Sequence, residues 1–193
     1  MNISKVNTSP AFGKYSVMSC QVKDVKSKEN NSATLCKLNT DDGNDANDVR
    51  YSKTAQAIRD DFFDAYYHGN NYKNFYLLQN DKTGEVISCA QTSWHYRNGD
   101  IQNPGFSTVI EQLSENDKYV NSGEPMLAYI INDASIKGFE SVYSVSTPSN
   151  QSQAVARAKF SKTGNEGITF MPQKSFLNFL DGAEKRSKID YIL

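Results

Sequence analysis

Hydrophobic residues recur every three or four positions in two stretches of the chain, and this spacing predicts two amphipathic helices. The first covers residues 51–69, where Ile58 and Phe62 fall on one face and a glycine ends the pattern. The second covers residues 124–138, where Pro125 suits the first turn because its missing N–H would be unpaired there anyway. Both helices are expected to bury one face.

Shorter apolar or alternating runs predict strands between these helices. The expected strands are residues 32–40, 74–80, 85–97, 106–113, 140–146 and 167–171. Residues 81–84 contain the Asp and Gly that favour a hairpin turn between the second and third of these strands. Further helices are expected at 153–164, which stops at a glycine, and near Phe176. The order predicts an α+β fold with a mixed, mostly antiparallel sheet flanked by helices.

The length of 193 residues is enough for one domain with a sizeable core. Residues 1–31 alternate short apolar and polar groups and predict an N-terminal arm, which leaves residues 32–193 as the folded domain. The arm could pair between subunits, so a homodimer is one expectation.

Charge and composition narrow the function classes. The 21 Lys and Arg side chains balance 22 Asp and Glu, so no basic excess points to nucleic acid and we expect no nucleic-acid partner. No segment has the pattern of a signal peptide or of a membrane span, so we expect a cytoplasmic protein without a membrane partner. The three cysteines are far apart and only two histidines exist, so we expect no metal site.

Two weak motifs lie at a meaningful distance from each other. Residues 118–123 read KYVNSG at the start of the second helix, and Gly123 precedes the Gly-Phe pair at Gly138 by fifteen residues. After the next strand, Ala156, Phe160 and Gly164 keep four-residue steps. On these residues the chain, over roughly 32–179, resembles the GCN5-related N-acetyltransferases (GNAT superfamily). The resemblance implies a GNAT-like fold with acetyl-CoA as co-substrate.

The resemblance assigns cofactor contacts to particular positions. Main-chain groups of two residues at the end of the fourth strand would bind the acetyl and pantetheine oxygens, the 118–123 loop would bind the pyrophosphate, and the later motif would complete the site. These positions are Leu113, Ser114, Lys118, Asn121, Ser122, Gly123, Asn150, Gln153 and Phe160.

The physics of the loop supports this assignment independently. A helix N-terminus offers about four unpaired N–H groups to an anion, and glycine allows close approach. Asn121 stands where the family has a glycine, but Asn tolerates left-handed backbone angles. Lys118 replaces the family's Gln or Arg and still supplies a cation. The alternative is an ordinary helix-entry turn with Ser122 as its cap.

Candidate catalytic residues follow from the direct transfer that the resemblance implies, in which a deprotonated amine attacks the thioester. Glu111 is a carboxylate in an otherwise apolar strand and is the favoured general base; alternatively it points to solvent. His95 is a second candidate base, or else a surface histidine. Phe160 stands where the family has a tyrosine that protonates the CoA thiolate, and it has no proton to donate. Tyr143 could replace it.

We therefore expect an acyl-CoA-dependent N-acyltransferase acting on a small-molecule or peptide amine. The alternative is a GNAT-fold protein with little or no catalysis that binds CoA or a protein partner.

Overall fold

The computed structural model describes most of the chain from residue 73 onward and several shorter pieces before it. The described residues are 5–6, 15–21, 56–58, 60–61, 64, 68, 73–80, 86–96, 106–116, 119–145, 153–186 and 190–191. The expected strand at 32–40 and the hairpin turn at 81–84 lie outside them, as do Lys118 and Asn150.

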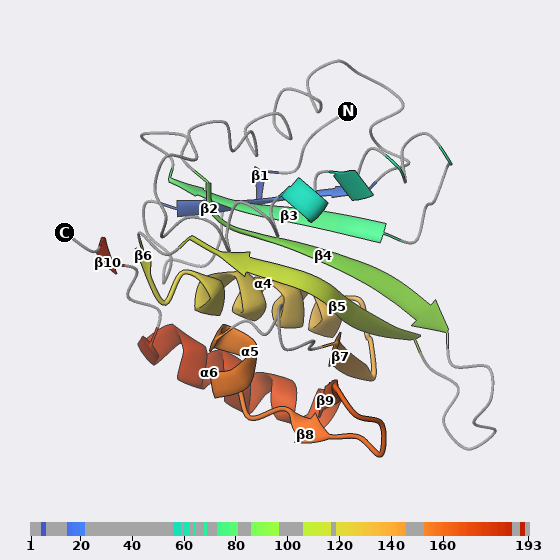
Figure 1. Cartoon of the computed structure of the whole chain (residues 1–193). Helices are drawn as coiled ribbons and strands as arrows, with labels where there is room; N and C mark the ends of the chain where they lie inside the picture. Colours follow the sequence, from blue (N-terminus) through green and yellow to red (C-terminus); the bar gives the residue numbers. More distant parts are fainter. Residues whose placement is uncertain are drawn as a thin grey trace.

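An eight-stranded sheet forms the centre of the molecule, with the strand order β1-β2-β3-β4-β5-β7-β9-β8 (Figure 1). Its strands are β1 (Lys5–Val6), β2 (Tyr15–Gln21), β3 (Lys73–Asn80), β4 (Val86–Tyr96), β5 (Phe106–Glu115), β7 (Ser141–Val145), β8 (Ser161–Lys162) and β9 (Ile168–Pro172). All neighbours pair antiparallel except β5 and β7, which are parallel. Parallel neighbours need a crossover, and here α4 (Gly123–Ile136) supplies it.

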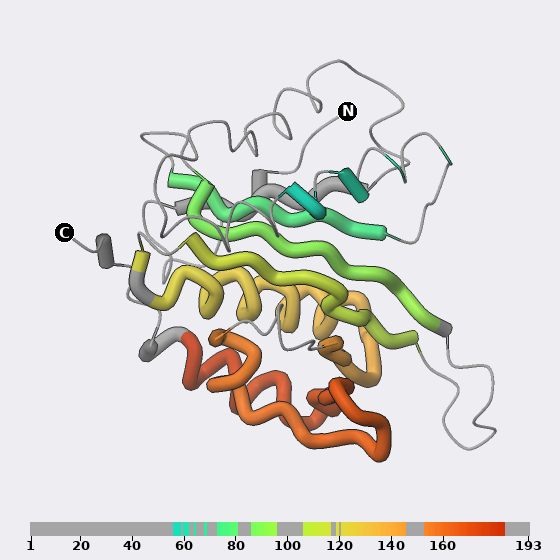
Figure 2. The backbone as a smooth tube through the Cα atoms, viewed as in Figure 1, coloured from blue at the N-terminus to red at the C-terminus, as the bar shows by residue number. Residues whose placement is uncertain are grey.

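Helix α4 and two helices that follow it cover one face of this sheet (Figures 1 and 2). Helix α4 packs against β3, β4, β5 and β7, while α5 (Gln153–Arg157) and α6 (Phe176–Arg186) pack against α4. A single 3-10 turn, Gln173–Ser175, leads into α6. The main hydrophobic core lies between the sheet and these helices, and Met126, Leu127 and Ile130 of α4 are almost completely buried in it. Burial of the apolar stripe explains why this stretch of sequence is helical.

The only parallel pair among the described strands separates before β5 ends. Register runs from Ser107 opposite Ser141 to Ile110 opposite Ser144 and stops there. Strand β5 continues to Glu115 with β4 as its neighbour. The last five residues of β5 therefore lie beyond its pairing with β7.

The α+β expectation is confirmed, and most predicted elements agree with the structure within a few residues. One expectation is wrong: the helix predicted for 153–164 ends at Arg157. Lys159 adopts a left-handed backbone conformation with φ 54°, and Ser161–Lys162 then pair with β9. Phe160 therefore follows the helix instead of lying on it.

Candidate functional site

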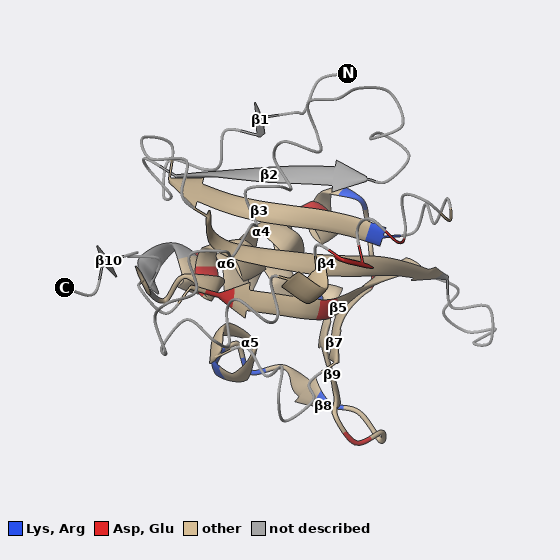
Figure 3. Cartoon of the chain, turned by 45° about the horizontal axis from the view of Figure 1, so that its top comes forward, with Lys and Arg blue, Asp and Glu red and all other residues tan. Residues whose placement is uncertain are grey.

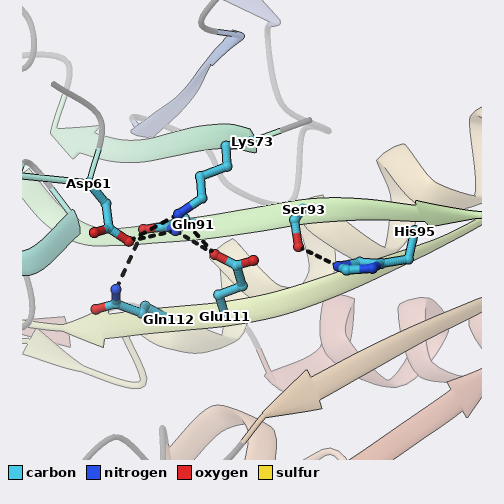
Figure 4. Close-up of polar contacts among 7 residues, drawn as sticks. All are labelled: Asp61, Lys73, Gln91, Ser93, His95, Glu111 and Gln112. Atoms are coloured by element: carbon cyan, nitrogen blue, oxygen red, sulfur yellow. Dashed lines mark hydrogen bonds and ion pairs between the residues drawn. The ribbon is translucent and has the colours of Figure 1, made fainter. Parts of the chain in front are cut away.

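A β-bulge gives Glu111 its direction. Gln91 of β4 lies opposite Gln112 of β5, whereas the next residue, Thr92, lies opposite Ile110. Glu111 is the extra residue of this bulge, and a bulge commonly re-aims a side chain next to an active site. The carboxylate points to the sheet face opposite α4, where it meets polar side chains from three other positions (Figure 4).

Four side chains form what we call the polar cluster: Asp61, Lys73, Gln91 and Glu111. Gln91 is fully buried, and its Nε2 donates to Glu111 Oε2 at 2.5 Å and to Asp61 Oδ2 at 2.9 Å. The Lys73 ammonium lies 3.3 Å from Asp61 Oδ2 and 3.6 Å from Glu111 Oε2. The Glu111 side chain is 30% exposed, so it is held on one side and reachable by solvent on the other.

The other two candidate catalytic residues lie on the same sheet face. His95 is exposed, and its Nε2 lies 3.0 Å from Ser93 Oγ, a pair on adjacent same-side positions of β4. Ser93, Val109 and Tyr143 occupy one row across the sheet, and residues in one row point to the same side. Tyr143 stacks on Phe170 with ring centroids 5.8 Å apart. The structure thus brings Glu111, His95 and Tyr143 to one face without direct contact between them among the interactions observed.

The described part of the β5–α4 connection before the helix, residues 119–122, contains one left-handed backbone conformation. Asn121 adopts φ 57°, the left-handed conformation in which Asn is tolerated. Gly123 is the first residue of α4, and Ser122 before it is buried. Ser122 makes no side-chain cap of the helix; its hydroxyl donates to the Asn116 carbonyl at 3.4 Å. The alternative of a Ser122 cap is therefore not what forms this turn.

The short strand β6 (Tyr119–Val120) in this connection pairs antiparallel with β10 (Asp190–Tyr191) near the C-terminus. The loop is thus tied to a segment distant in sequence.

Glu115 joins the loop to α5. Its Oε2 accepts from the Gln153 N–H at 3.1 Å and its Oε1 from the Ala154 N–H at 3.2 Å. The same carboxylate lies beside Gly123, where a side chain in place of the glycine hydrogen would overlap it. A carboxylate from β5 thus lies between the N-termini of α4 and α5, where the anionic part of CoA was expected.

The remaining cofactor candidates have structural contacts. Leu113 is in the main core, and Phe160 is half-buried against it. Ser114 is buried, and its side chain bonds the Cys89 thiol across the β4–β5 pair. Burial raises the pKa of Cys89 from 9.0 to about 12, more than the Ser114 hydrogen bond lowers it. Cys89 is therefore a protonated, unreactive thiol at neutral pH.

A cavity of about 360 Å³ lies at the other end of α5. Arg157 and Lys159 are at its rim, and Met171 and Phe179 belong to its apolar wall. The cavity involves none of the residues that the sequence assigned to cofactor or catalysis. No group of three His, Cys, Asp or Glu side chains in the described part of the chain is arranged to hold a metal ion.

Strand β5, the loop before Gly123, helix α4 and strand β7 follow one another in the predicted order, in a mixed and mostly antiparallel sheet. The fold is GNAT-like. No protein-family model matches the chain, and no curated protein matches it either.

Solved structures are similar to the chain at low identity. One is described as a bacterial toxin (17% identity, 67% of this chain and 81% of that chain, TM-score 0.49). A second is AtaT complexed with acetyl-methionyl-tRNAfMet (14% identity, 64% and 85%, TM-score 0.49). A third is a KacTA-DNA complex (15% identity, 66% and 86%, TM-score 0.48). At this identity no residue role is transferred from them.

These structures correct one expectation. The exclusion of nucleic acid, and with it the expectation of a small-molecule or peptide acceptor, is contradicted by similar proteins in complex with DNA and with tRNA. The physical error was to use net charge, which averages over the whole surface and says little about a local contact. Figure 3 shows basic and acidic residues interspersed over several elements of the described chain. Among the residues that the structure describes, no helix is long and apolar enough to cross a membrane.

The sequence alone did not identify Asp61, Lys73, Gln91 and Glu115. A weak signal existed for Gln91, because it shares the side of β4 on which His95 lies. The partners of Glu115 are 38 and 39 positions away, and only the tertiary structure brings them together.

Proposed function

We propose that this protein transfers an acyl group, acetyl in the simplest case, from CoA directly to an amine. The observation that carries the proposal is the separation of β5 from β7 directly before the bulge that projects Glu111. A donor thioester placed at this separation would lie near both the main chain of β5 beyond the β7 pairing and a partly exposed carboxylate. Positioning of this kind contributes several kcal/mol to acyl transfer.

Glu111 is the general base of the proposed reaction. An ammonium acceptor must lose a proton before its nitrogen attacks the thioester carbonyl, and a carboxylate within one water of the amine can accept it. Gln91 and Lys73 hold the Glu111 carboxylate in place from the protein side. His95 and Tyr143 lie farther along the same face and serve as secondary candidates for proton transfer.

The donor named by the resemblance is acetyl-CoA. Another similar structure, AtaTR, is described as bound with AcCoA (15% identity, 64% of this chain and 84% of that chain, TM-score 0.47). The acceptor we propose is an amine attached to tRNA, because AtaT is described with acetyl-methionyl-tRNAfMet.

A second candidate is a GNAT-fold protein that binds CoA without catalysis. The specific observation in its favour is Phe160, which follows α5 and packs on the core, so that no tyrosine hydroxyl protonates the leaving thiolate from this position. A thiol of pKa about 8.5 can take its proton from water, so the substitution lowers the expected rate without abolishing transfer.

Two measurements test the proposal. Acetyl-CoA at millimolar concentration should raise the melting temperature, because a ligand that binds only the folded state stabilises it by mass action. With labelled acetyl-CoA and a panel of aminoacylated tRNAs, with peptides and polyamines for comparison, label should enter an aminoacyl group and free CoA thiol should appear in equal amount. A melting curve that acetyl-CoA leaves unchanged would contradict both candidates, whereas binding without transfer would support the second.

A further inference from the structure

We propose that Glu115 is an internal competitor of the CoA diphosphate, a carboxylate latch that must leave its place before acyl-CoA binds. The inference rests on the proposed function and concerns the regulation of the same site. In this proposal the loop residues 118–123 contact CoA, whereas Glu115 limits the affinity with which CoA binds.

The geometry defines the latch. Glu115 is the last residue of β5, beyond the point at which β7 stops pairing with that strand. Its two carboxylate oxygens accept from the N–H groups of Gln153 and Ala154, the first two residues of α5. The side chain therefore links the end of β5 to α5, the described element that follows β7.

The Glu115 carboxylate also lies beside the start of α4. Gly123 begins α4, and a Cβ there would overlap the Glu115 side chain, so the glycine makes room for a carboxylate in this structure. An anion at the α4 N-terminus is stabilised by the helix dipole, which makes the position favourable for Glu115 and for a phosphate alike. Both cannot occupy it together.

Charge makes the competition unfavourable for the ligand. Hydrogen bonds from N–H groups to a carboxylate are stronger than neutral ones, and two of them would have to break. A diphosphate arriving beside an ionised carboxylate would in addition meet a like charge. The wild-type chain is therefore expected to bind CoA more weakly than a variant without this carboxylate.

A purely structural role for Glu115 makes the opposite prediction. If the carboxylate only caps α5 and keeps the loop in shape, its removal should disorder the site and weaken the binding of CoA. The sign of the change in affinity thus separates a latch from a cap, whatever happens to stability.

The experiment is a calorimetric titration with CoA itself, which has a readout independent of activity. The variants are Glu115→Gln, which is nearly isosteric and uncharged, and Glu115→Asp, which is one methylene shorter and cannot reach both N–H groups. Glu166→Gln is the matched control, because Glu166 is exposed between β8 and β9 and its change alters the net charge equally. Circular dichroism and a thermal melt establish that each variant is folded, and the Asp variant carries the test if the Gln variant does not fold.

The expected result is a dissociation constant about tenfold lower for Glu115→Gln than for wild type, a smaller decrease for Glu115→Asp, and no change for Glu166→Gln. A folded Glu115 variant that binds CoA no better than the wild type overturns the latch while leaving the proposed function intact. If the wild type and every variant fail to bind millimolar CoA, the proposed function itself fails and the latch with it.

Discussion

Glu111 shows how one inserted residue can create a candidate site in an otherwise regular strand pair. Without the bulge, strict alternation along β5 would give Glu111 and Val109 one orientation and Gln112 the other, whereas Gln112 here lies opposite Gln91. The bulge lets Glu111 and Gln112 both approach Gln91, with the Gln112 Nε2 to Gln91 Oε1 distance at 3.5 Å. Gln91, buried and amide-bearing, thus orients the proposed base.

Replacing this base should slow the chemical step specifically. Glu111→Gln keeps the size of the side chain but cannot accept a proton, so we expect kcat to fall about 10²-fold with the acceptor identified in the panel. The affinity for CoA should change less than twofold, because Glu111 lies on the sheet face opposite α4 and its N-terminal loop. Steady-state kinetics together with CoA titration measure both quantities.

Asp61→Asn is the matched control for Glu111→Gln. Asp61 shares the partners Lys73 and Gln91 with Glu111, so its neutralisation disturbs the polar cluster without removing the proposed base. We expect a change in kcat below about fivefold, since partly exposed ion pairs contribute under about 1 kcal/mol. Equal losses in the two variants would mean that the cluster has a structural role and that Glu111 is not the base.

The sequence could predict Glu111 but not its neighbours. A carboxylate in the apolar run of β5 is visible in the residues themselves. Lys73 and Gln91 are ordinary polar residues until strand register places Lys73 opposite Ser93 and Gln91 opposite Gln112, which are 20 and 21 positions away in the sequence. Asp61 is a helical residue, and only the tertiary structure brings it to Gln91.

Helix α5 ends in an unusual way. The residue that stops a helix in the left-handed conformation is commonly Gly, but Lys159 occupies this position with φ 54°. The sequence predicted a helix to Gly164 because a glycine stop was the visible signal, and nothing in the letters marks a lysine as left-handed. Helix α4, by contrast, was predictable because its long apolar stripe determines both its type and its packing.

Lys159→Gly should therefore stabilise the protein. A left-handed conformation costs a non-glycine residue about 1–2 kcal/mol, and glycine removes this cost. Part of the gain in stability is lost, because glycine has more conformational freedom in the unfolded chain. We expect a net gain of about 0.5–1 kcal/mol in the free energy of unfolding, measured by urea denaturation. Asn121→Gly, at φ 57°, should gain less because Asn tolerates this conformation better. A loss of stability in Lys159→Gly would contradict the strained end of α5.

The two faces of the central sheet have different roles. Helices α4, α5 and α6 bury the apolar face, and the polar cluster lies on the other. Each face of the sheet also carries a buried titratable group. The Tyr76 hydroxyl donates to Asp133 Oδ2 of α4 at 3.2 Å, and burial together with the Asp133 charge raises its pKa well above 10.0. Cys89 lies buried on the opposite side of β4.

These two groups make the fold sensitive to alkali. The unfolded chain loses the Cys89 proton above pH 9, whereas the folded state keeps it to about pH 12, so the folded state binds more protons in between. The free energy of unfolding should then fall with rising pH, by up to about 1.4 kcal/mol per pH unit for this one thiol. The contribution is fully present below pH 9, and Tyr76 adds a similar loss above pH 10.

Urea denaturation at pH 8, 9, 10 and 11 measures this dependence, and Cys89→Ala is the comparison. The variant leaves a small cavity and should be less stable at pH 8, but it has no thiol to ionise, so its stability should fall less steeply between pH 9 and 11. The difference in the free energy of unfolding between the two proteins should narrow by about 1 kcal/mol or more over this range. The reason is that the Cys89 thiol of the wild type ionises in the unfolded chain but stays protonated in the folded one. Parallel curves would show that Cys89 titrates equally in the folded and unfolded chains, and would place its side chain in contact with solvent.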